Sequence, residues 1–285
     1  MMPKISIIMP TYNRKYCIKN AIDSLLAQTY QGFELIVVDD GSRDGTDSYV
    51  KSLYSDEVKN GKIRYIKLPE NRGQSFAKNE GLKKAQYDWI GYLDTDNRMH
   101  PDFLEIFMES IDRYPDRQVF YAQHRRVYSK CVVGSPFNLD LLVSGNYIDM
   151  GVFVHSKTVY HDLGGFDFSL HCLDDWDLII LYTEKYHPVF IEKVLLDYSD
   201  DPKALRATSI GNHKNEYKKI ILKYYQRIPE ADFMSRYQNL FVKYTTKDNT
   251  TNDLIETISH MKSSKFWKLR ERYMSFKKML KKRFI

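Results

Sequence analysis

The sequence predicts an α/β fold, in which a mainly parallel central sheet is flanked by helices and followed by a C-terminal helical extension. Two observations lead to it. Short apolar runs alternate along the first half of the chain with segments whose apolar residues recur at helical spacing. Polar turns follow the first, second and fourth of these runs, at residues 10–13, 39–46 and 94–97. Repeated alternation of strand and helix is typical of a parallel sheet covered on both faces.

The expected elements follow one another in a regular order. Apolar runs predict strands at residues 5–9, 34–38, 63–68, 89–93 and 119–122. Helical spacing of apolar residues predicts helices at residues 18–26, 47–54, 75–85 and 103–111, a helix that starts near Asp174 and further helix from Asn215 onward.

Composition indicates an ordered globular chain. Of the 285 residues, 43% are hydrophobic and 28% are charged, and the 22 Tyr and 15 Phe favour order over disorder. The three cysteines are odd in number and too far apart for a metal knuckle, which indicates a reducing compartment. The sequence shows no export signal and no apolar run near the roughly 18 residues that span a bilayer. We therefore expect a cytoplasmic protein.

The basic character of the chain is concentrated in residues 262–285. That tail holds ten Lys or Arg against one acid, Glu271, so it carries +9, and since the whole chain carries +6 the remainder carries about −3. Apolar residues lie along one face of the predicted tail helix: Phe266, Leu269, Tyr273, Phe276 and Leu280. Such a helix is typical of a peripheral contact with an anionic membrane surface, here the cytoplasmic face of the inner membrane. Docking on the acidic body of the protein, or on RNA, is the alternative, and we expect no nucleic-acid partner.

Two carboxylates end the fourth predicted strand. Asp94 and Asp96 are separated by Thr95, and residues i and i+2 of an extended segment point the same way. They can therefore converge on a divalent cation that also holds phosphate oxygens, although an Asp-rich turn whose side chains bond their own backbone fits equally well. Because the carboxyl ends of parallel strands meet at one edge, the three polar turns lie together there, and we expect a ligand site at that edge.

The absent motifs restrict the class of ligand. No Gly-x-Gly-x-x-Gly follows the first strand, and no Gly-x-x-x-x-Gly-Lys-Ser/Thr loop is present. Phosphate is then expected to be neutralised by a cation on the acids and not by a glycine-rich cradle. A nucleoside diphosphate compound held through a metal ion fits this combination.

Six segments resemble, in order and spacing, the motif series of the family 2 inverting glycosyltransferases, which have the GT-A fold. They are Pro10-Thr11-Tyr12-Asn13-Arg14, Val37-Val38-Asp39-Asp40-Gly41-Ser42-x-Asp44-Gly45-Thr46, Asn71-x-Gly73 with Ala77-Lys78-Asn79, Leu93-Asp94-x-Asp96-Asn97, Leu163-Gly164-Gly165-Phe166-Asp167 and Leu173-Asp174-Asp175-Trp176-Asp177-Leu178. The resemblance covers roughly residues 3–200 and implies an enzyme of the bacterial surface-glycan type.

The resemblance implies a role for each matching position. Thr11, Tyr12 and Asp40 hold the uridine, with Asp40 facing the uracil. Asp94 approaches the ribose, and Asp96 binds the Mn²⁺ or Mg²⁺ ion that bridges the diphosphate, with Asp94 beside it. The other positions of the nucleotide-sugar site are Pro10, Asn71, Gly73, Lys78, Thr95, Asp174 and Trp176. The family more often has Arg at the position of Lys78. Lysine keeps the positive charge but lacks the planar guanidinium group that can form two parallel hydrogen bonds.

The stretch from Asp174 to Leu178 has two interpretations. As local structure, Asp174 is a natural N-cap and Asp177 stands where the acid of a capping box belongs. That leaves Asp175 unexplained. An acceptor hydroxyl must lose a proton as it attacks an anomeric carbon, and an aspartate within hydrogen-bond reach is the base this requires. The resemblance assigns the role of catalytic base to Asp175, and the family more often has Glu where Asp174 stands.

Two further segments have open interpretations. The eight histidines include no helical His-x-x-x-His pair, and a lone His213 is either a further metal ligand, as in some GT-A enzymes, or structural. His124-Arg125-Arg126-Val127-Tyr128 lies in a region that faces the acceptor in such enzymes, or it is a solvated loop.

We expect a GT-A domain at residues 1–205, with a nucleotide-sugar half at 1–115 and an acceptor half at 116–205. A helical extension then covers residues 206–285 and ends in the basic amphipathic tail. The expected function is metal-dependent, inverting transfer of a sugar from a UDP-sugar to a glycan or lipid-linked acceptor in surface polysaccharide biosynthesis. The alternatives are a sugar-phosphate nucleotidyltransferase, whose Gly-rich opening loop this chain lacks, and a catalytically silent membrane-associated scaffold.

Overall fold

A computed structural model describes residues 3–201, 216–217, 219–221 and 223–224 of the chain. The strands are β1 (Ile5–Thr11), β2 (Phe33–Asp39), β3 (Ile63–Lys67), β4 (Trp89–Tyr92), β5 (Arg98–Met99), β6 (Val119–Arg126), β7 (Cys131–Val133), β8 (Phe153–Ser156) and β9 (Val189–Tyr198). The helices are α1 (Ile18–Leu26), α2 (Thr46–Leu53), α3 (Ser55–Lys59), α4 (Gln74–Lys84), α5 (Phe103–Arg113), α6 (Leu139–Ser144), α7 (Lys157–Leu163) and α8 (Asp174–Lys185), with a 3₁₀ turn η1 (Met150–Val152).

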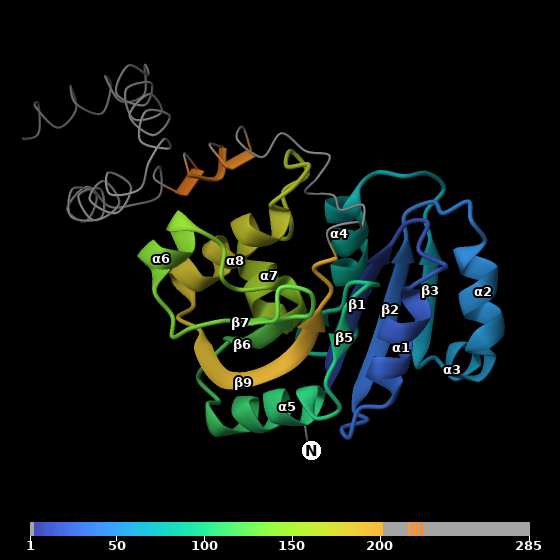
Figure 1. The fold of residues 1–285 in the computed structure, drawn as a ribbon, viewed down its shortest axis with the longest axis horizontal. Coiled ribbons are helices and arrows are strands. Elements are labelled where there is room, and N and C mark those ends of the chain that lie inside the picture. Colours follow the sequence, from blue (N-terminus) through green and yellow to red (C-terminus); the bar gives the residue numbers. More distant parts are fainter. Residues whose placement is uncertain (1–2, 202–215, 218, 222, 225–285) are drawn as a thin grey trace, which may run out of the picture. The chain divides into compact units, whose positions relative to one another are not determined.

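The strands form one sheet whose N-terminal part is parallel. Its order is β3-β2-β1-β4-β8-β6-β9-β5, and β7 pairs with β6 outside this path. The pairs among β3, β2, β1 and β4 are all parallel, as the alternation of apolar runs and helices predicts. Beyond β4 the sheet is mixed, because β8 is antiparallel to both β4 and β6 while β6 and β9 are parallel. Figure 1 shows β9 as a long curved strand on the side of the sheet away from β3.

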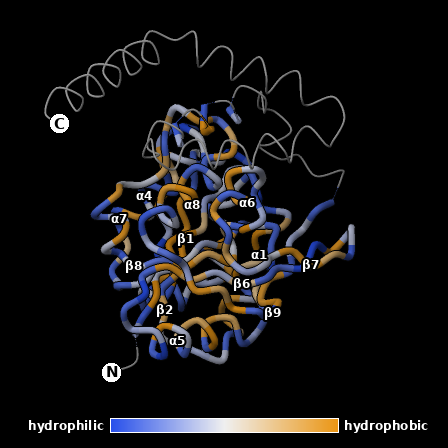
Figure 2. Tube along the Cα trace, turned by 90° about the vertical axis from the view of Figure 1, so that its left-hand side faces the viewer, coloured by the Kyte–Doolittle hydropathy of each residue, from blue (hydrophilic) through white to orange (hydrophobic). Residues whose placement is uncertain are grey.

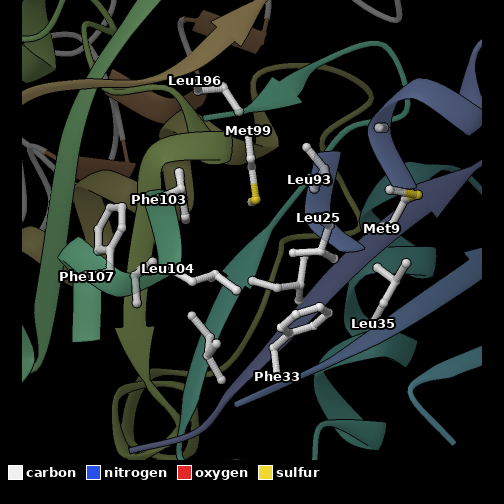
Figure 3. Close-up of a cluster of buried hydrophobic side chains, with 14 of the residues drawn as sticks. Met9, Leu25, Phe33, Leu35, Leu93, Met99, Phe103, Leu104, Phe107 and Leu196 are labelled. Atoms are coloured by element: carbon white, nitrogen blue, oxygen red, sulfur yellow. The ribbon is translucent and has the colours of Figure 1, made fainter. Parts of the chain in front are cut away.

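The two faces of the sheet are covered by different helices. Alternate residues of β1 and β2 pack with α1, α2 and α5 in one buried cluster, to which Met9, Leu25, Phe33 and Phe107 belong (Figure 3). On the opposite face α4 lies against β1, where a Cβ on Gly81 would come within 2.5 Å of Ile8. Figure 2 shows hydrophobic segments along the strands. Strands that are apolar along their whole length are expected where both faces of a sheet are buried, because removal of this apolar surface from water stabilises the fold.

Some boundaries differ from those that the pattern predicts. The strand predicted at 119–122 continues to Arg126, across irregular pairing with β9 on either side of Gln123. The polar run Gln123 to Arg126 lacks an apolar pattern, and therefore the sequence alone does not predict this half of β6. The helix predicted at 47–54 is also followed directly by a second one, α3.

The chain divides into two compact units, Met1–Glu216 and Tyr217–Ile285. In the second unit, the described positions of residues 217–224 are helical, and Ile220, Ile221 and Tyr224 are buried, as their spacing predicts. His213 and the basic tail at 262–285 lie outside the described residues, as does nearly all of the helical extension. Within the described part, no helix has the length and apolar character needed to cross a bilayer.

Candidate active site

The turns that follow β1 and β2 are joined by hydrogen bonds at the carboxyl edge of the sheet. The amide of Asp40 donates to the carbonyl of Thr11 over 2.8 Å. The amide of Asn13 donates to Ser42 Oγ, and Arg43 N donates to Asn13 Oδ1, both over 2.9 Å. Asn13 itself has a left-handed backbone, with φ at +52°. The two turns therefore form one pre-organised edge, as the parallel order predicts.

Asp40 ties a third loop to this edge. Its two oxygens accept the amides of Arg72 and Gly73, each over 2.8 Å. Gly41 permits the approach, because a Cβ there would lie 2.7 Å from the carbonyl carbon of Glu70 and its φ is +78°. Burial raises the pKa of Asp40 although these two amides lower it. Each oxygen keeps a second lone pair, so the predicted contact between Asp40 and a base remains compatible with the geometry.

The neighbouring side chains suit a nucleoside. Thr11 is buried, and its Oγ1 has no hydrogen-bond partner among the described residues. A buried hydroxyl without a partner is costly unless a ligand or water satisfies it. Tyr12 is 43% exposed beside it and offers an aromatic face. Pro10 is the partly buried residue before Thr11, and Asn71 is exposed in the loop that Asp40 holds.

Asp94 and Asp96 lie in a tight turn and not on an extended segment. β4 ends at Tyr92, and Asn97 N donates to the carbonyl of Asp94 over 3.2 Å. Both acids are partly buried, while Thr95 between them is buried. Burial raises the pKa of Asp94 to about 7, with Asp96 adding to the shift and Lys78 opposing it. The turn that the sequence left as an alternative is thus present, and the two carboxylates still interact within it.

The residues present fit a divalent cation that is completed by its ligand. No group of three or more His, Cys, Asp or Glu side chains in the described part of the chain is placed to hold a metal ion. Mg²⁺ and similar ions often bind one or two carboxylates and take substrate phosphates and water as the other ligands. Asp94 and Asp96 supply two such carboxylates. Burial is the main cause of the raised pKa of Asp94, and the negative charges of Asp96, Asp149 and Asp175 add to it, which a cation would counteract.

The first turn of α8 meets α4 through a buried cluster of polar side chains. Lys78 Nζ lies 3.2 Å from Asp174 Oδ2 and 3.1 Å from Asp175 Oδ1. Asp174 also accepts from Gln74 Nε2 over 2.7 Å and from Ser75 Oγ over 3.1 Å. The side chains of Lys78 and Asp174 are 3% and 0% exposed, whereas that of Asp175 is 34% exposed. Of the two acids in this cluster, only Asp175 combines a fixed position with access to solvent.

The charges in this cluster set the ionisation of both acids. Burial raises the pKa of Asp174, and the attraction of Lys78 opposes that shift. Burial also raises the pKa of Asp175, but attraction to Lys78 and hydrogen bonds to Asp174 and Lys78 outweigh it, so this pKa lies below its usual value. Asp175 is therefore held as the anion that a general base requires.

The capping prediction for the start of α8 is wrong. The N-cap is Leu173, which has a left-handed backbone with φ at +63° and makes no side-chain cap. Asp174 is the first helical residue, and its carboxylate turns toward α4 and not toward its own backbone. A non-glycine residue in this conformation is strained, and such residues concentrate at functional sites.

Trp176 makes a structural contact. It is 2% exposed, and its Nε1 donates to the carbonyl of Leu142 over 2.8 Å. This bond ties α6 to the helix that carries Asp175. The resemblance predicts a contact between Trp176 and the nucleotide sugar, and the structure gives the indole this protein partner.

Two charged residues at the site escaped the sequence analysis. Asp149 precedes η1, accepts from Gly151 N over 2.8 Å and interacts electrostatically with Asp94 and Asp175. Burial raises the pKa of Asp149 to about 6. Arg14 interacts electrostatically with Asp96 and bonds Tyr16. Arg14 belongs to the first motif, which is a signal for it, whereas Asp149 stands in no motif, so the sequence held no signal for it.

Comparison with known proteins indicates the family of the chain. The family model described as "Glycosyl transferase family 2" matches residues 6–132. The chain carries a family 2 glycosyltransferase domain. An uncharacterized glycosyltransferase of Rickettsia typhi is 30% identical over 207 residues, which are 68% of this chain and 63% of that protein. The GalNAc(5)-diNAcBac-PP-undecaprenol beta-1,3-glucosyltransferase of Campylobacter jejuni is 31% identical over 158 residues, 55% of this chain and 47% of that protein.

Solved structures confirm the GT-A fold of this family 2 domain. S. aureus TarS 1–349 in complex with UDP-GlcNAc superposes with a TM-score of 0.66 at 19% identity, over 82% of this chain and 72% of that one. The mannosyltransferase PcManGT from Pyrobaculum calidifontis, in complex with GDP-Man and Mn²⁺, gives 0.63 at 17% identity, over 94% and 83%. The chain covers 63% of the Rickettsia typhi relative and 40% of an uncharacterized glycosyltransferase of Haemophilus influenzae that is 41% identical over 104 residues.

Proposed function

We propose that this protein is a metal-dependent, inverting glycosyltransferase that moves a sugar from a UDP-sugar to a glycan or lipid-linked acceptor. The observation that carries the proposal is the environment of Asp175. Its carboxylate is held at one oxygen by Lys78, is 34% exposed and interacts electrostatically with Asp94. A base at that position, next to acids that suit a metal-bound diphosphate, is what direct sugar transfer requires.

The reaction that fits this site is a single in-line displacement. Asp175 removes the proton of the acceptor hydroxyl. The acceptor oxygen forms a bond to the anomeric carbon of the donor sugar while the bond from that carbon to the diphosphate oxygen breaks. Because the attack comes from the face opposite the leaving group, the configuration at the anomeric carbon inverts. Asp94 and Asp96 would hold the cation, and a bound Mn²⁺ or Mg²⁺ ion supplies charge that stabilises the departing diphosphate.

The UDP donor is supported by the nucleoside edge and by one structural neighbour. Thr11 offers an unpaired hydroxyl, Tyr12 an aromatic face and Asp40 acceptor oxygens for an imide N–H. TarS 1–349 has been solved with UDP-GlcNAc, whereas PcManGT has been solved with GDP-Man. A lipid-linked acceptor is supported by the Campylobacter jejuni relative, whose name specifies a PP-undecaprenol substrate. Surface polysaccharide synthesis at the cytoplasmic face of the inner membrane, with the basic tail as membrane contact, is part of this proposal.

Asp175→Asn tests the proposed function. UDP release is measured with a panel of UDP-sugars, with Mn²⁺ and after EDTA treatment, for the wild type and the variant. We expect turnover in the wild type, loss of about 10³-fold in the variant because the base is removed, and unchanged thermal stability within a few degrees. Asp116→Asn, the same substitution at an exposed aspartate, should retain full activity. Near-normal turnover in Asp175→Asn would exclude this residue as the base.

The two alternative functions are less well supported. A sugar-phosphate nucleotidyltransferase does not account for the family match over residues 6–132. A silent scaffold would show no UDP release with any donor, and the wild-type arm of the experiment above decides this.

A further inference from the structure

Helix α4 buries polar residues where an ordinary surface helix buries apolar ones. Ser75, Lys78 and Asn79 are at most 7% exposed, and Lys78 is 2% exposed. A buried ammonium is costly unless carboxylates pair with it. Lys78 has two such partners, and both belong to the first turn of α8, 96 and 97 residues further along the chain. We therefore expect the role of Lys78 to involve the first turn of α8.

The two aspartates differ in their burial and in the contacts that they make. Asp174 is fully buried and accepts from three side chains of α4, namely Gln74, Ser75 and Lys78. These contacts leave no opening for solvent at Asp174. Asp175 accepts from Lys78 Nζ at Oδ1, shares a side-chain hydrogen bond with Asp174, and keeps 34% of its side chain exposed, so that a substrate can reach it. Asp174 anchors the ammonium, and the ammonium in turn fixes Asp175.

We propose that Lys78 is a positioning residue for the catalytic base, which it orients through one carboxylate oxygen and keeps ionised, and that Asp174 serves as the anchor of Lys78 and not as a ligand of the donor sugar. The inference deepens the proposed function and depends on Asp175 being the base. It replaces the donor-side role that the resemblance gives to Lys78 and Asp174 with a role between two helices.

The surrounding charges make the lysine necessary. Asp175 faces Lys78 on α4, Asp174 beside it on α8, Asp149 before η1 and Asp94 after β4. Three of these four neighbours are acids, and the charges of Asp94 and Asp149 repel a charge on Asp175. Lys78 is the cation that opposes them, and without it burial and like charges act on Asp175 together.

The test compares Lys78→Met with Lys78→Arg and with Lys84→Met, an exposed lysine on the same helix as matched control. The pH profile of kcat for UDP release is recorded from pH 5 to 9, together with KM for the donor. In Lys78→Met we expect the acidic limb of the kcat profile to move to higher pH. The ratio of wild-type kcat to variant kcat should then be about tenfold greater at pH 6 than at pH 8. Lys78→Arg keeps the charge and should restore the limb, and Lys84→Met should match the wild type.

Other results would overturn the inference. If Lys78→Met raises KM for the donor and leaves the acidic limb of the kcat profile unchanged, Lys78 contacts the donor. If kcat falls equally at every pH, Lys78 has a structural role only. Because Lys78→Met leaves Asp174 and Asp175 without their cation, thermal melting of each variant checks folding. Lys78→Arg remains informative if the methionine variant does not fold.

A second measurement separates this inference from the proposed function. The carboxyl carbons of the aspartates are labelled with ¹³C and titrated by NMR in the wild type, Lys78→Arg and Lys78→Met, with Asp175→Asn to assign the signal. We expect the pKa of Asp175 to stay below that of an ordinary aspartate when lysine or arginine is present at position 78, and to rise in Lys78→Met. If the wild type releases no UDP, the proposed function fails while this titration still decides the role of Lys78. An unchanged midpoint in Lys78→Met refutes it.

Discussion

The side-chain amide of Asn79 and the backbone of Phe166 form two reciprocal hydrogen bonds. Asn79 Nδ2 donates to the Phe166 carbonyl over 2.8 Å, and the Phe166 amide donates to Asn79 Oδ1 over 2.9 Å. Gly165 makes room for this pair, since a Cβ there would lie 2.1 Å from Asn79 Oδ1. Two motifs that lie far apart in the sequence, one on α4 and one before α8, are thus halves of one contact.

Asn79→Ala should therefore destabilise the fold. The change leaves a buried amide and a buried carbonyl of Phe166 without partners, at a cost of about 3 kcal/mol in the free energy of unfolding. Urea unfolding monitored by circular dichroism measures it. Asn20→Ala, at an exposed position on α1, should change the free energy by less than about 0.5 kcal/mol. Equal effects of the two substitutions would contradict this account of the contact.

Gly73→Ala should weaken nucleotide binding because it changes the backbone conformation of the loop, without a steric clash of the added methyl group. Gly73 has φ at +92° with no atom within 4 Å of a built Cβ, and its amide donates to Asp40. Gly61 has φ at +81° and the same open space, far from the site in sequence. Both Gly→Ala changes should cost about 1–2 kcal/mol of stability from strain. UDP affinity, measured by calorimetry, should fall for Gly73→Ala and stay unchanged for Gly61→Ala.

Asp96→Ala should remove the metal dependence of nucleotide binding. A ligand that binds only the folded state raises the melting temperature, and we expect UDP with Mn²⁺ to raise that of the wild type more than UDP with EDTA. In Asp96→Ala the two conditions should give the same melting temperature, because one of two carboxylates for the ion is lost. Asp112→Ala, on the exposed side of α5, should behave as the wild type. A persisting Mn²⁺ effect in Asp96→Ala would argue for ligands elsewhere.

Stability should fall with pH below about 6.5 because of a buried histidine. His155 is 0% exposed, contacts the ring of Tyr182, and lies 2.9 Å from Tyr92 Oη and 2.8 Å from the Ser156 carbonyl. Burial lowers its pKa to about 4, while an exposed histidine titrates near 6.5. Between these values the unfolded chain binds more protons than the folded one, so the free energy of unfolding decreases as pH falls, by on the order of 3 kcal/mol in total.

His155→Gln isolates this contribution. Glutamine keeps hydrogen-bonding groups but does not titrate, so its stability deficit relative to the wild type should shrink as pH falls from 7 to 4. Urea unfolding at pH 7, 6, 5 and 4 follows the difference. Burial also lowers the pKa of His124 to about 4, so part of the pH dependence should persist in the variant. A deficit that is constant over this range would contradict the assignment to His155.

The parallel half of the sheet and its polar edge could be predicted because both depend on local pattern. Apolar runs that are buried on both faces read as strands, and turn residues mark where each strand ends. The position of Asp175 on the first turn of a helix also follows from local spacing. These signals span a few residues each, and no partner distant in the sequence is needed to interpret them.

Contacts between distant segments could not be predicted in this way. The carboxylate of Asp174 was expected to cap its own helix, which is the commonest local solution, but Gln74, Ser75 and Lys78 offer it better-buried partners. Asp149 reaches the site because η1, β4 and α8 meet in space, a fact that no spacing encodes. The resemblance names candidate residues, but it does not specify which partners each of them contacts.

The dependence of α4 on the first turn of α8 limits how the specificity of this protein can be re-engineered. Exchanging either segment alone with that of another transferase separates Lys78 from its two carboxylates and Asn79 from the backbone of Phe166. Chimeras that alter substrate preference must therefore transplant residues 74–79 and 165–175 as one block. The hairpin between β6 and β7 lies outside that block, and its turn is bonded to Asp200, so those two segments form a separate unit of exchange.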